Sequence, residues 1–495
     1  MLKVHDIDFF KQFTDKETFA KLKKYETIQS LLKEKKNEAK DFLALSYKNE
    51  TLTYAQLYKR CCQTTNIAMS IKKNSHVAIL CNSDMNFITT TLGLIANGLT
   101  VVFIPTSLSA LEINLLVDKY DITALFYSSD FQKVIDELNV SIEKVNIQEI
   151  LNSKAKSFTR KVRESDVAAI IFSRKENGEL RGAMLTHKSL MTSAYYGTLG
   201  IKKTYNQRYY SILPFTHVFG FVRNILTPLS TSSSIYICSN MRRMFKEIPD
   251  CRPTMMVLVP GILEMILNVS KKFKMDLFNR QLHTIIVGGA AMPTYLIEQY
   301  KQLGADIFQG YGMTETSSLI SGNMDPYNKP LSVGVFFPNQ EAKIINNELY
   351  IKGENQMSGY YNDIEETNKV MVDGFIKTGD LAYVDEDNFL YLQGRCDNII
   401  ILTNGENVSP VKIENKVNNI DFVLASLVYA EEDLLTIDVV LRKEAIKDII
   451  DVDKALKDEI ANINKTLATF ERVCKINIVD SLPYDENMKL IRKRG

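Results

Sequence analysis

The N-terminal part of the chain alternates short apolar runs with segments in which apolar residues recur at helical spacing. Five apolar runs are typical of buried strands, and they begin at His76, Thr100, Ile122, Val167 and His283. Helical spacing is found in DMNFITTTLGLIANG, SALEINLLVDKYD and PTYLIEQYKQLG, which lie between or after these runs. This alternation predicts parallel sheets covered by helices.

Beyond Pro330 the pattern changes to the period of two that is typical of hairpins. The stretch VDGFIKTGDLAYVDEDNFLYLQG carries Asp-Gly and Asp-Asn pairs, which favour turns between alternating strands. The end of the chain changes again to the pattern helix, two strands, helix, strand, from SPVKIENKVNNI to VCKINIVD. We therefore predict an α/β protein. Its large N-terminal domain, 1–395, holds parallel and mixed sheets with covering helices and a β-rich subdomain, and a small α+β domain, 396–495, follows.

Composition narrows the kind of partner. The chain has 495 residues, of which 45% are hydrophobic, so it can form large cores. Sixty Lys and Arg against 59 Asp and Glu give a net charge of +1, which predicts a small-molecule partner and no nucleic acid. The N-terminus MLKVHDIDFFKQF lacks the apolar core of a signal peptide, and no stretch approaches membrane-spanning length. We expect a cytoplasmic protein with no integral membrane association.

Cysteine and histidine usage gives no sign of a structural framework. The seven cysteines are odd in number and form no C-x-x-C pair, so we expect most of them to be buried and reduced. The five histidines show no metal-binding spacing, and we predict no structural metal.

The segment 170–190, IIFSRKENGELRGAMLTHKSL, raises a specific question. A strand, a glycine-containing turn and a helix start form a suitable context for phosphate, because free backbone N–H groups and the helix dipole attract anions. Only Gly178 and Gly182 are present, and charged runs usually mark exposed turns. The segment taken alone is compatible with a phosphate loop or with a solvated hairpin.

Three separated stretches carry candidate chemistry. VGGAAMPTYL, from Val287, is a strand that enters a Gly-Gly turn, where a flat ligand can approach the backbone. DIFQGYGMTETSS, from Asp306, presents a ring, a hydroxyl and a carboxylate close together, and GFIKTGDLAY, from Gly374, adds an aspartate that we place on a sharp turn. The order and spacing of these stretches, with Lys489 in LPYDENMKLIRKRG near the end, are more specific than any single glycine pattern.

With these motifs, the chain resembles the adenylate-forming superfamily, which comprises acyl- and aryl-CoA synthetases, peptide-synthetase adenylation domains and firefly luciferase. The resemblance runs from LTYAQLYKR, at Leu52, to PYDENMKLIRKR, at Pro483, and QMSGYYND and NGENVSPVKIE are similar to bacterial AMP-forming fatty-acid:CoA ligases. It implies ATP-dependent activation of a carboxylic acid to an acyl-adenylate with release of pyrophosphate. The acyl group then passes to the thiol of CoA or to the phosphopantetheine of an acyl carrier protein.

The resemblance also implies roles for single residues. For the nucleotide, Gly288, Gly289 and Ala290 would lie against adenine, Tyr311 would stack on it beside Gly312, and Asp380 would accept the ribose hydroxyls. Thr314 would donate a hydrogen bond to the phosphates of ATP and of the adenylate. Glu315 would hold Mg²⁺, and Arg395 would lie near ribose or phosphate.

Further roles follow for the small domain, which the resemblance makes mobile. Lys489 would bridge carboxylate and α-phosphate during adenylation, Asp397 would be the hinge, and the loop at Gly405 would face the thiol tunnel. His217, in ILPFTHVFGF, matches a position near the acyl carboxylate, and a histidine satisfied in the core is the equal alternative.

The resemblance answers the question of segment 170–190. The family's Y-T-S-G-T-T-G-x-P-K-G loop corresponds to residues 172–182, so hydroxyls and one glycine are replaced by charged side chains. Ser173, Arg174, Lys175, Gly178 and Arg181 would then contact ATP phosphates, with the cations as clamps. Alternatively the altered loop closes the cradle, and the protein is a non-catalytic or impaired acyl- or nucleotide-binding relative. We expect an enzyme, because the other site positions are intact, and the apolar FTHVFGFVRNILTPL favours a fatty or aryl acid.

Overall fold

Six strands between residues 76 and 186 form the first sheet. The computed structural model describes residues 1–174, 179–274, 277–278, 280–402, 406–431, 434–443, 445–447, 449–483 and 490–491. The sheet has the order β6-β5-β3-β4-β7-β8, and it is parallel except that β8 runs antiparallel to β7. Its strands are β3 (His76–Leu80), β4 (Thr100–Phe103), β5 (Ile122–Tyr127), β6 (Glu143–Asn146), β7 (Val167–Arg174) and β8 (Leu180–Thr186).

Helices follow the strands of this sheet as the periodicity predicts. The expected helices are α6 (Met85–Ala96) and α7 (Ala110–Lys119). Eleven residues of α6 are buried, because the helix lies between the sheet and two further helices, α3 (Ile28–Glu38) and α4 (Tyr54–Cys61). The remaining short helices of this part are α1 (Ile7–Lys11), α2 (Lys16–Lys21), α5 (Thr65–Ser70), α8 (Gln132–Asp136) and α9 (Ile147–Leu151).

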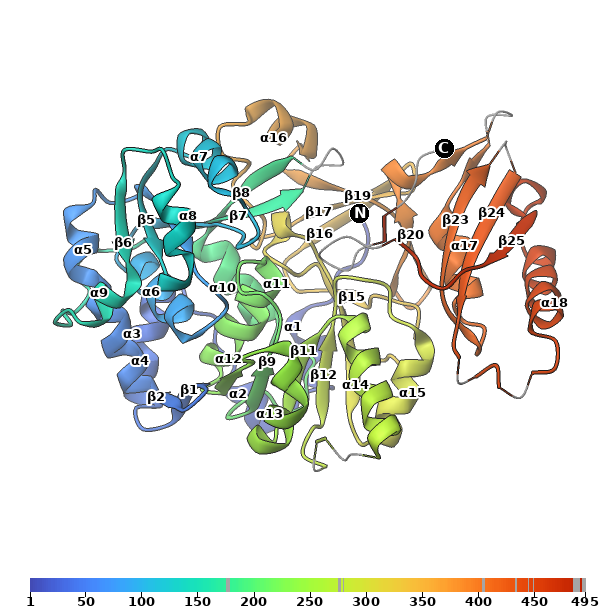
Figure 1. Cartoon of the computed structure of the whole chain (residues 1–495), viewed down its shortest axis with the longest axis horizontal. Helices are drawn as coiled ribbons and strands as arrows, with labels where there is room; N and C mark the ends of the chain where they lie inside the picture. The colour runs from blue at the N-terminus through green and yellow to red at the C-terminus, as the bar shows by residue number, and fades with distance from the viewer. Residues whose placement is uncertain are drawn as a thin grey trace.

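A nine-stranded mixed sheet lies beside the first (Figure 1). Its order is β15-β14-β13-β12-β11-β9-β10-β1-β2, with the bounds β15 (Val335–Phe336), β14 (Ser321–Asn323), β13 (Asp306–Tyr311), β12 (Thr284–Val287), β11 (Met255–Leu258), β9 (Arg208–Ser211), β10 (Ser234–Ile237), β1 (Leu43–Tyr47) and β2 (Glu50–Thr53). The central strands are parallel, which confirms the predicted architecture.

Each face of the nine-stranded sheet is covered by helices. One face packs against α13 (Met244–Cys251), α14 (Pro260–Phe273) and α15 (Thr294–Gln302). On the opposite side lie α10 (His187–Tyr196) and a continuous helical segment made of α11 (Val218–Phe221), the π-helical turn η3 (Val222–Leu226) and α12 (Thr227–Ser230). This second layer and the strands that it covers enclose a cavity described below.

The β-rich subdomain is an antiparallel sheet. Its elements are β16 (Glu341–Ile345), β17 (Glu348–Lys352), α16 (Ile364–Val370), β18 (Met371–Val372), β19 (Phe375–Val384) and β20 (Leu390–Arg395). Asp373 and Gly374 have φ of 51° and 79°, so this Asp-Gly pair forms the predicted turn. Asp380, in contrast, lies inside β19 next to a register shift, so its expected placement on a sharp turn is wrong.

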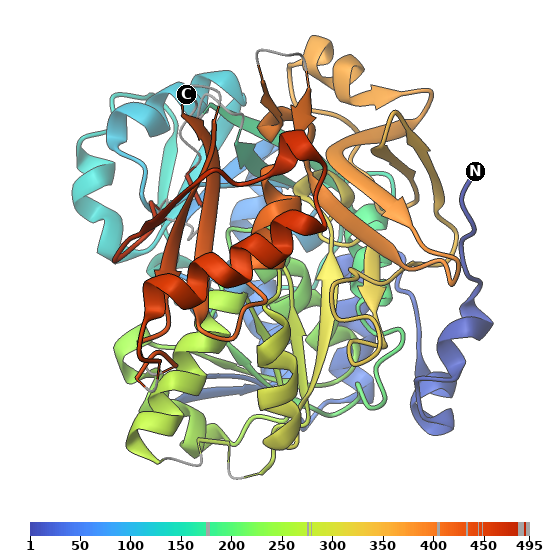
Figure 2. The same ribbon diagram turned by 90° about the vertical axis from the view of Figure 1, so that its right-hand side faces the viewer.

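The C-terminal part has the predicted order of elements and its own core. After the short pair β21 (Ile400–Ile401) and β22 (Asn407–Val408) come α17 (Pro410–Val417), β23 (Val423–Glu431), β24 (Leu434–Leu441), α18 (Val452–Lys465) and β25 (Lys475–Ile478). Ile413, Val439, Leu456 and Ile460 pack in that core. Figure 2 shows this part in front of the larger one, with α18 toward the viewer. The boundary at residue 395 and the mobility of this part stay predictions.

The segment 170–190 forms a hairpin, which is one of the two alternatives that the sequence leaves open, and it ends on a helix start. Strands β7 and β8 pair as an antiparallel hairpin, with Ser173 opposite Arg181, and the helix begins only afterwards at His187. Gly182 has a local cause, because a Cβ there would lie 2.4 Å from the ring of Tyr120. The second strand therefore lies between the turn and the helix start at THKSL, where Thr186 caps α10. A close approach of Tyr120 explains Gly182.

The cysteines are less buried than expected. All seven are free, and three of them, Cys61, Cys62 and Cys81, are buried. Three others are partly buried, and Cys474 is exposed. The expectation that most are core residues is therefore wrong.

Candidate functional site

The carboxyl ends of β12 and β13 form one wall of the candidate site. Directly after β12, Gly288 is buried, and a Cβ there would lie 3.1 Å from both the ring of Phe219 and the carbonyl of Gly310. Gly289 has φ of +82° and is exposed, as is Ala290. The Gly-Gly turn thus leaves backbone accessible at the end of the strand, as the sequence predicts for the approach of a flat ligand.

The next strand presents Tyr311 to a carboxylate. The hydroxyl of Tyr311 donates to Oδ2 of Asp380, which comes from β19, 69 residues further along the chain. Burial is the main cause that raises the pKa of Asp380, and Arg395 and Tyr311 act in the opposite direction. The same burial, with the charge of Asp380, raises the pKa of Tyr311, so this hydroxyl stays a donor at neutral pH.

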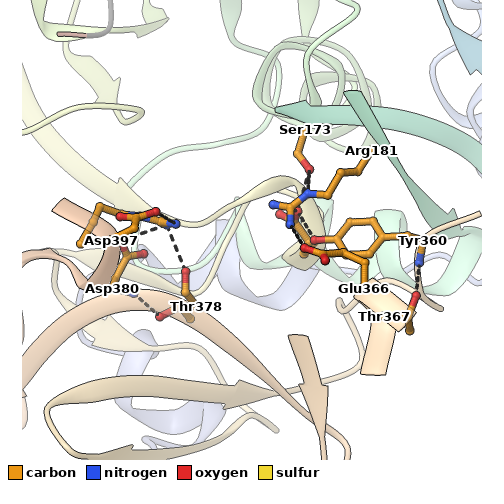
Figure 3. A network of polar contacts seen from close by, with 10 residues as sticks. Ser173, Arg181, Tyr360, Glu366, Thr367, Thr378, Asp380 and Asp397 are labelled. Carbon is orange, nitrogen blue, oxygen red and sulfur yellow. Dashed lines mark hydrogen bonds and ion pairs between the residues drawn. The ribbon is translucent and has the colours of Figure 1, made fainter. Parts of the chain in front are cut away.

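Arg395, at the end of β20, contacts both Asp380 and Asp397. Its Nη1 is 3.4 Å from Oδ1 of Asp380 and donates to the carbonyl of Thr378 at 3.1 Å. Its Nε and Nη2 donate to the two carboxylate oxygens of Asp397 at 3.3 and 3.2 Å (Figure 3). Burial works against this charge, but the hydrogen bonds and the two carboxylates outweigh it and raise the pKa of Arg395. The guanidinium therefore joins the proposed ribose-binding residue to the proposed hinge.

A second cluster surrounds Glu315, whose side chain is 2% exposed. Ser173 and Tyr360 both donate hydroxyl hydrogen bonds to its Oε1, at 2.8 and 2.7 Å. Nη2 of Arg181 lies 3.6 Å from the same oxygen. Burial, followed by Glu315, raises the pKa of Tyr360, which keeps this hydroxyl protonated. The hairpin β7–β8 and the turn after β13 therefore meet at one carboxylate (Figure 3).

Arg181 also reaches Glu366 on α16. Its Nη1 donates to Oε1 of Glu366 at 2.8 Å, and its Nε lies 3.3 Å from Oγ of Ser173. The guanidinium carbon lies 4.8 Å from the ring centre of Tyr360, which is a cation–π distance. Arg181 is thus held between a carboxylate, a hydroxyl and an aromatic ring, and its side chain is 17% exposed.

Tyr360 and Glu366 were missed in the sequence as members of the site. Tyr360 stands in QMSGYYND, a stretch that indicated only a resemblance. Glu366 is one acid among several in NDIEETNKV, and helical spacing alone gives no reason to single it out.

The other described candidates lie near these two clusters or at the edge of the helical layer. Gly312 is required by close packing, because a Cβ there would lie 2.1 Å from the carbonyl of Ser318. Thr314 is the first residue of the 3₁₀ turn η5 (Thr314–Thr316), and Glu315 follows it in the same turn. Arg174 is exposed at the end of β7. His217 is exposed at the N-cap of α11, so the alternative of a histidine satisfied in the core is wrong.

Four predicted positions lie outside the described residues: Lys175, Gly178, Gly405 and Lys489. Their roles stay predictions. In the part of the chain that the structure describes, no group of three or more His, Cys, Asp or Glu side chains is arranged to hold a metal ion. The helices of that part include none that is long and apolar enough to cross a membrane.

Comparison with known families identifies the fold and the motifs together. The model of the family "AMP-binding enzyme" matches residues 32–361, and the model of the "AMP-binding enzyme C-terminal domain" matches residues 397–494. The chain belongs to the AMP-binding enzyme family. This family membership confirms the predicted adenylate-forming superfamily, so the protein is an enzyme of the AMP-forming acid–CoA ligase class.

Relatives of this AMP-binding enzyme are similar over most of its length. A 4-coumarate--CoA ligase-like 9 from Arabidopsis thaliana is 27% identical and covers 92% of this chain and 86% of that protein. A 2-succinylbenzoate--CoA ligase from Bacillus cytotoxicus is 23% identical over 94% of this chain and 98% of the relative. The solved O-succinylbenzoate coenzyme A synthetase of Bacillus subtilis with ATP and a magnesium ion is 23% identical, with a TM-score of 0.79 and coverage of 93% and 98%. At this identity the solved structure supports the fold.

Proposed function

We propose that the protein activates a fatty or aryl carboxylic acid with ATP and then transfers the acyl group to CoA or to the phosphopantetheine of an acyl carrier protein. The observation that carries this proposal is the convergence of Tyr311, Asp380 and Arg395 with Glu315 and Arg181. These residues come from three separate parts of the chain. Tyr311 donates to Asp380 across 69 residues, and Nη2 of Arg181 lies 3.6 Å from Oε1 of Glu315. They supply an aromatic ring, two carboxylates and two guanidinium groups around one turn.

The nucleoside part of ATP fits the first cluster. The ring of Tyr311 offers a flat contact surface beside the bare backbone of Gly288 and Gly289. Asp380 accepts one hydrogen bond through each carboxylate oxygen, from Tyr311 and from Arg395. A carboxylate oxygen has two lone pairs, so both oxygens of Asp380 keep capacity for the ribose hydroxyls.

The second cluster fits the phosphates and magnesium. Among the described residues, the hydrogen bonds and the ion pair of the Glu315 carboxylate all involve Oε1, which leaves Oε2 as a hard oxygen ligand. Mg²⁺ prefers this kind of ligand together with phosphate oxygens and retained waters, so Glu315 and ATP would hold it. When bound, the ion offsets charge on the departing pyrophosphate. Ser173, Thr314 and Arg181 would donate hydrogen bonds to the phosphates, with Arg181 as the charged donor.

The reaction requires that the acid carboxylate approach the α-phosphate in line. An ammonium group between these two anions lowers their repulsion, and the family resemblance assigns this role to Lys489. The carboxylate oxygen then forms a bond to phosphorus while the bond to pyrophosphate breaks. In the second step the thiol attacks the acyl carbon, AMP leaves, and the thiol proton passes to solvent. Rotation at Asp397 would bring the loop at Gly405 to the thiol.

A direct test is incubation with Mg-ATP and a panel of carboxylic acids, with acyl-AMP and pyrophosphate detected by mass spectrometry and by a coupled assay. Adding CoA or a phosphopantetheinylated carrier protein then identifies the acceptor. An acyl-AMP that disappears on addition of a thiol supports the proposal. Binding of Mg-ATP without product from any acid would favour the non-catalytic alternative, and no binding would contradict both nucleotide clusters.

A further inference from the structure

A buried arginine lies in the helical layer that covers the nine-stranded sheet. Arg223 belongs to η3 and is 2% exposed. Its Nη1 donates to Oγ1 of Thr227 at 3.3 Å. Within the described ranges, its Nε has no hydrogen-bond partner, and no acidic side chain forms an ion pair with it. Arginine is rarely buried unless it is paired, because removing an unpaired charge from water is costly.

Several features show that the fold accommodates this guanidinium. A Cβ at residue 197 would lie 1.3 Å from Nη1 of Arg223, so Gly197 leaves the space that the cation occupies. Pro228 has no N–H to bond to the carbonyl of residue 224, which is consistent with the wider π-helical turn at this point. Burial lowers the pKa of Arg223 to about 10, so the group is still charged at neutral pH.

Arg223 faces a cavity of about 30 Å³. The lining residues that matter here come from β12, β13 and β14, and they are Ile286, Gly310, Ser321 and Asn323. The volume is enough for roughly two waters. The cavity therefore lies between the guanidinium of Arg223 and the strands β12 and β13, whose ends carry the residues proposed to bind the nucleotide.

The helical segment extends from this cavity toward the candidate site. Phe219 and Arg223 are four residues apart, so their side chains point from the same face. The ring of Phe219 lies against Gly288, and His217 is exposed at the start of the helix. From His217 to Arg223 the helix rises by roughly 9 Å at 1.5 Å per residue. A chain molecule that displaces the ring of Phe219 would span this distance.

We propose that Arg223 is a specificity-determining residue that binds a second carboxylate at the distal end of the acid substrate. The inference rests on the proposed function, because it needs the reacting carboxylate to lie at the end marked by His217. The substrate class is then a dicarboxylic acid of medium length. A simple fatty acid would leave the guanidinium buried beside a methyl group, and such a mismatch is strongly disfavoured.

The first test compares straight-chain dicarboxylic acids, from succinic to sebacic acid, with monocarboxylic acids of equal carbon number. Pyrophosphate release with Mg-ATP gives kcat/KM for each acid. We expect the best dicarboxylic acid to exceed its monocarboxylic counterpart by about 10- to 100-fold, as a charge-assisted hydrogen bond allows. In Arg223→Met this preference should be lost, with lower values for the dicarboxylic acid and higher values for the monocarboxylic acid.

Two further variants separate charge from packing. Arg223→Lys keeps the charge without the planar fork and should retain part of the preference. Arg243→Met is the matched control, because the Arg243 side chain is 62% exposed and its neighbour is Glu247 on α13. It should leave the ratio between the two acids unchanged.

Thermal unfolding gives a readout that does not depend on turnover. Since Arg223 is an unpaired buried charge, Arg223→Met should keep or raise the Tm of the free protein. Millimolar dicarboxylic acid alone should raise the Tm of the wild type and not that of Arg223→Met. A lower Tm of Arg223→Met, with no change in acid preference, would overturn the inference and make Arg223 a structural residue.

The outcomes also distinguish this inference from the proposed function. If monocarboxylic acids are adenylated and Arg223→Met leaves the ratio unchanged, the inference fails and the function stands. If no acid releases pyrophosphate but dicarboxylic acids raise the Tm through Arg223, the function fails and the binding site stands. If neither effect is seen, both are overturned.

Discussion

Replacement of Arg181 by alanine tests whether the charged hairpin is a working part of the nucleotide site. In the structure, the Arg181 guanidinium donates to Glu366 at 2.8 Å, lies 3.3 Å from Ser173 and is 3.6 Å from Glu315. ATP phosphates in this position would replace Glu366 as the acceptor of the hydrogen bonds that Arg181 donates. Arg181→Ala should therefore weaken the binding of ATP. The binding of a pre-formed acyl-adenylate, which has no β- or γ-phosphate, should be nearly unaffected.

The size of the effect follows from these contacts. A charge-assisted hydrogen bond contributes about 1.5–3 kcal/mol. Binding of phosphate replaces one such bond, to Glu366, by at least two to phosphate oxygens, so the net gain is about one bond. At 1.4 kcal/mol for each factor of ten, Arg181→Ala should raise the KM for ATP by about 10- to 100-fold.

Glu366→Gln should change the KM for ATP in the opposite direction. It keeps the shape of the side chain and removes the negative charge that competes with phosphate for Arg181. The KM for ATP should then fall by a few-fold. If Glu366 instead orients Arg181 toward ATP, the KM rises.

The assay is pyrophosphate release at varied ATP with saturating acid, together with acyl-adenylate affinity by calorimetry. Lys369→Ala is the control, because Lys369 is 70% exposed and lies 3.7 Å from Glu366 in the same network. An exposed ion pair contributes little, so its KM should change by less than about twofold. Equal losses of ATP and acyl-adenylate affinity in Arg181→Ala would refute the reasoning. A large gain of activity on restoring the family's Ser/Thr/Gly loop would show that the native loop is impaired.

Three further predictions concern other parts of the protein. Lys489→Ala should abolish acyl-adenylate formation and spare thioester formation from added acyl-adenylate, because its charge acts in the first step; equal loss in both assays contradicts this role. Asp397→Pro should reduce thioester formation far more than pyrophosphate release, since proline fixes φ, and unchanged thioester formation would place the hinge elsewhere. Burial lowers the pKa of His187 to about 4 against 6.5 in the unfolded chain, so its contribution to stability is complete above pH 6.5 and falls by about 1.4 kcal/mol per unit toward pH 4. Denaturant unfolding of His187→Gln should lack this loss, and an identical pH profile would contradict it.

Much of the architecture follows from local pattern. Strand and helix periods arise from which residues face the core, and each period is encoded within a few turns or strand residues. This is why the sequence predicts the parallel strands, the covering helices α6, α7 and α15, and the element order of the C-terminal part. The Gly-Gly turn and the Asp-Gly turn were equally predictable, because glycine adopts positive φ freely and Asp and Asn tolerate it better than most other residues.

The charged contacts of the site depend on distant parts of the chain. Arg181 meets Glu366 across 185 residues, and Ser173 meets Glu315 across 142, so no local pattern selects these partners. The helix start at THKSL was predictable, because Thr186 caps α10, whereas the strand β8 before it depends on pairing with β7. Arg223 is the clearest case: one arginine in the apolar stretch FVRNILTPL could face solvent or the interior. Its burial beside a cavity is set by Gly197, which is 26 positions earlier in the chain and close only in the folded protein.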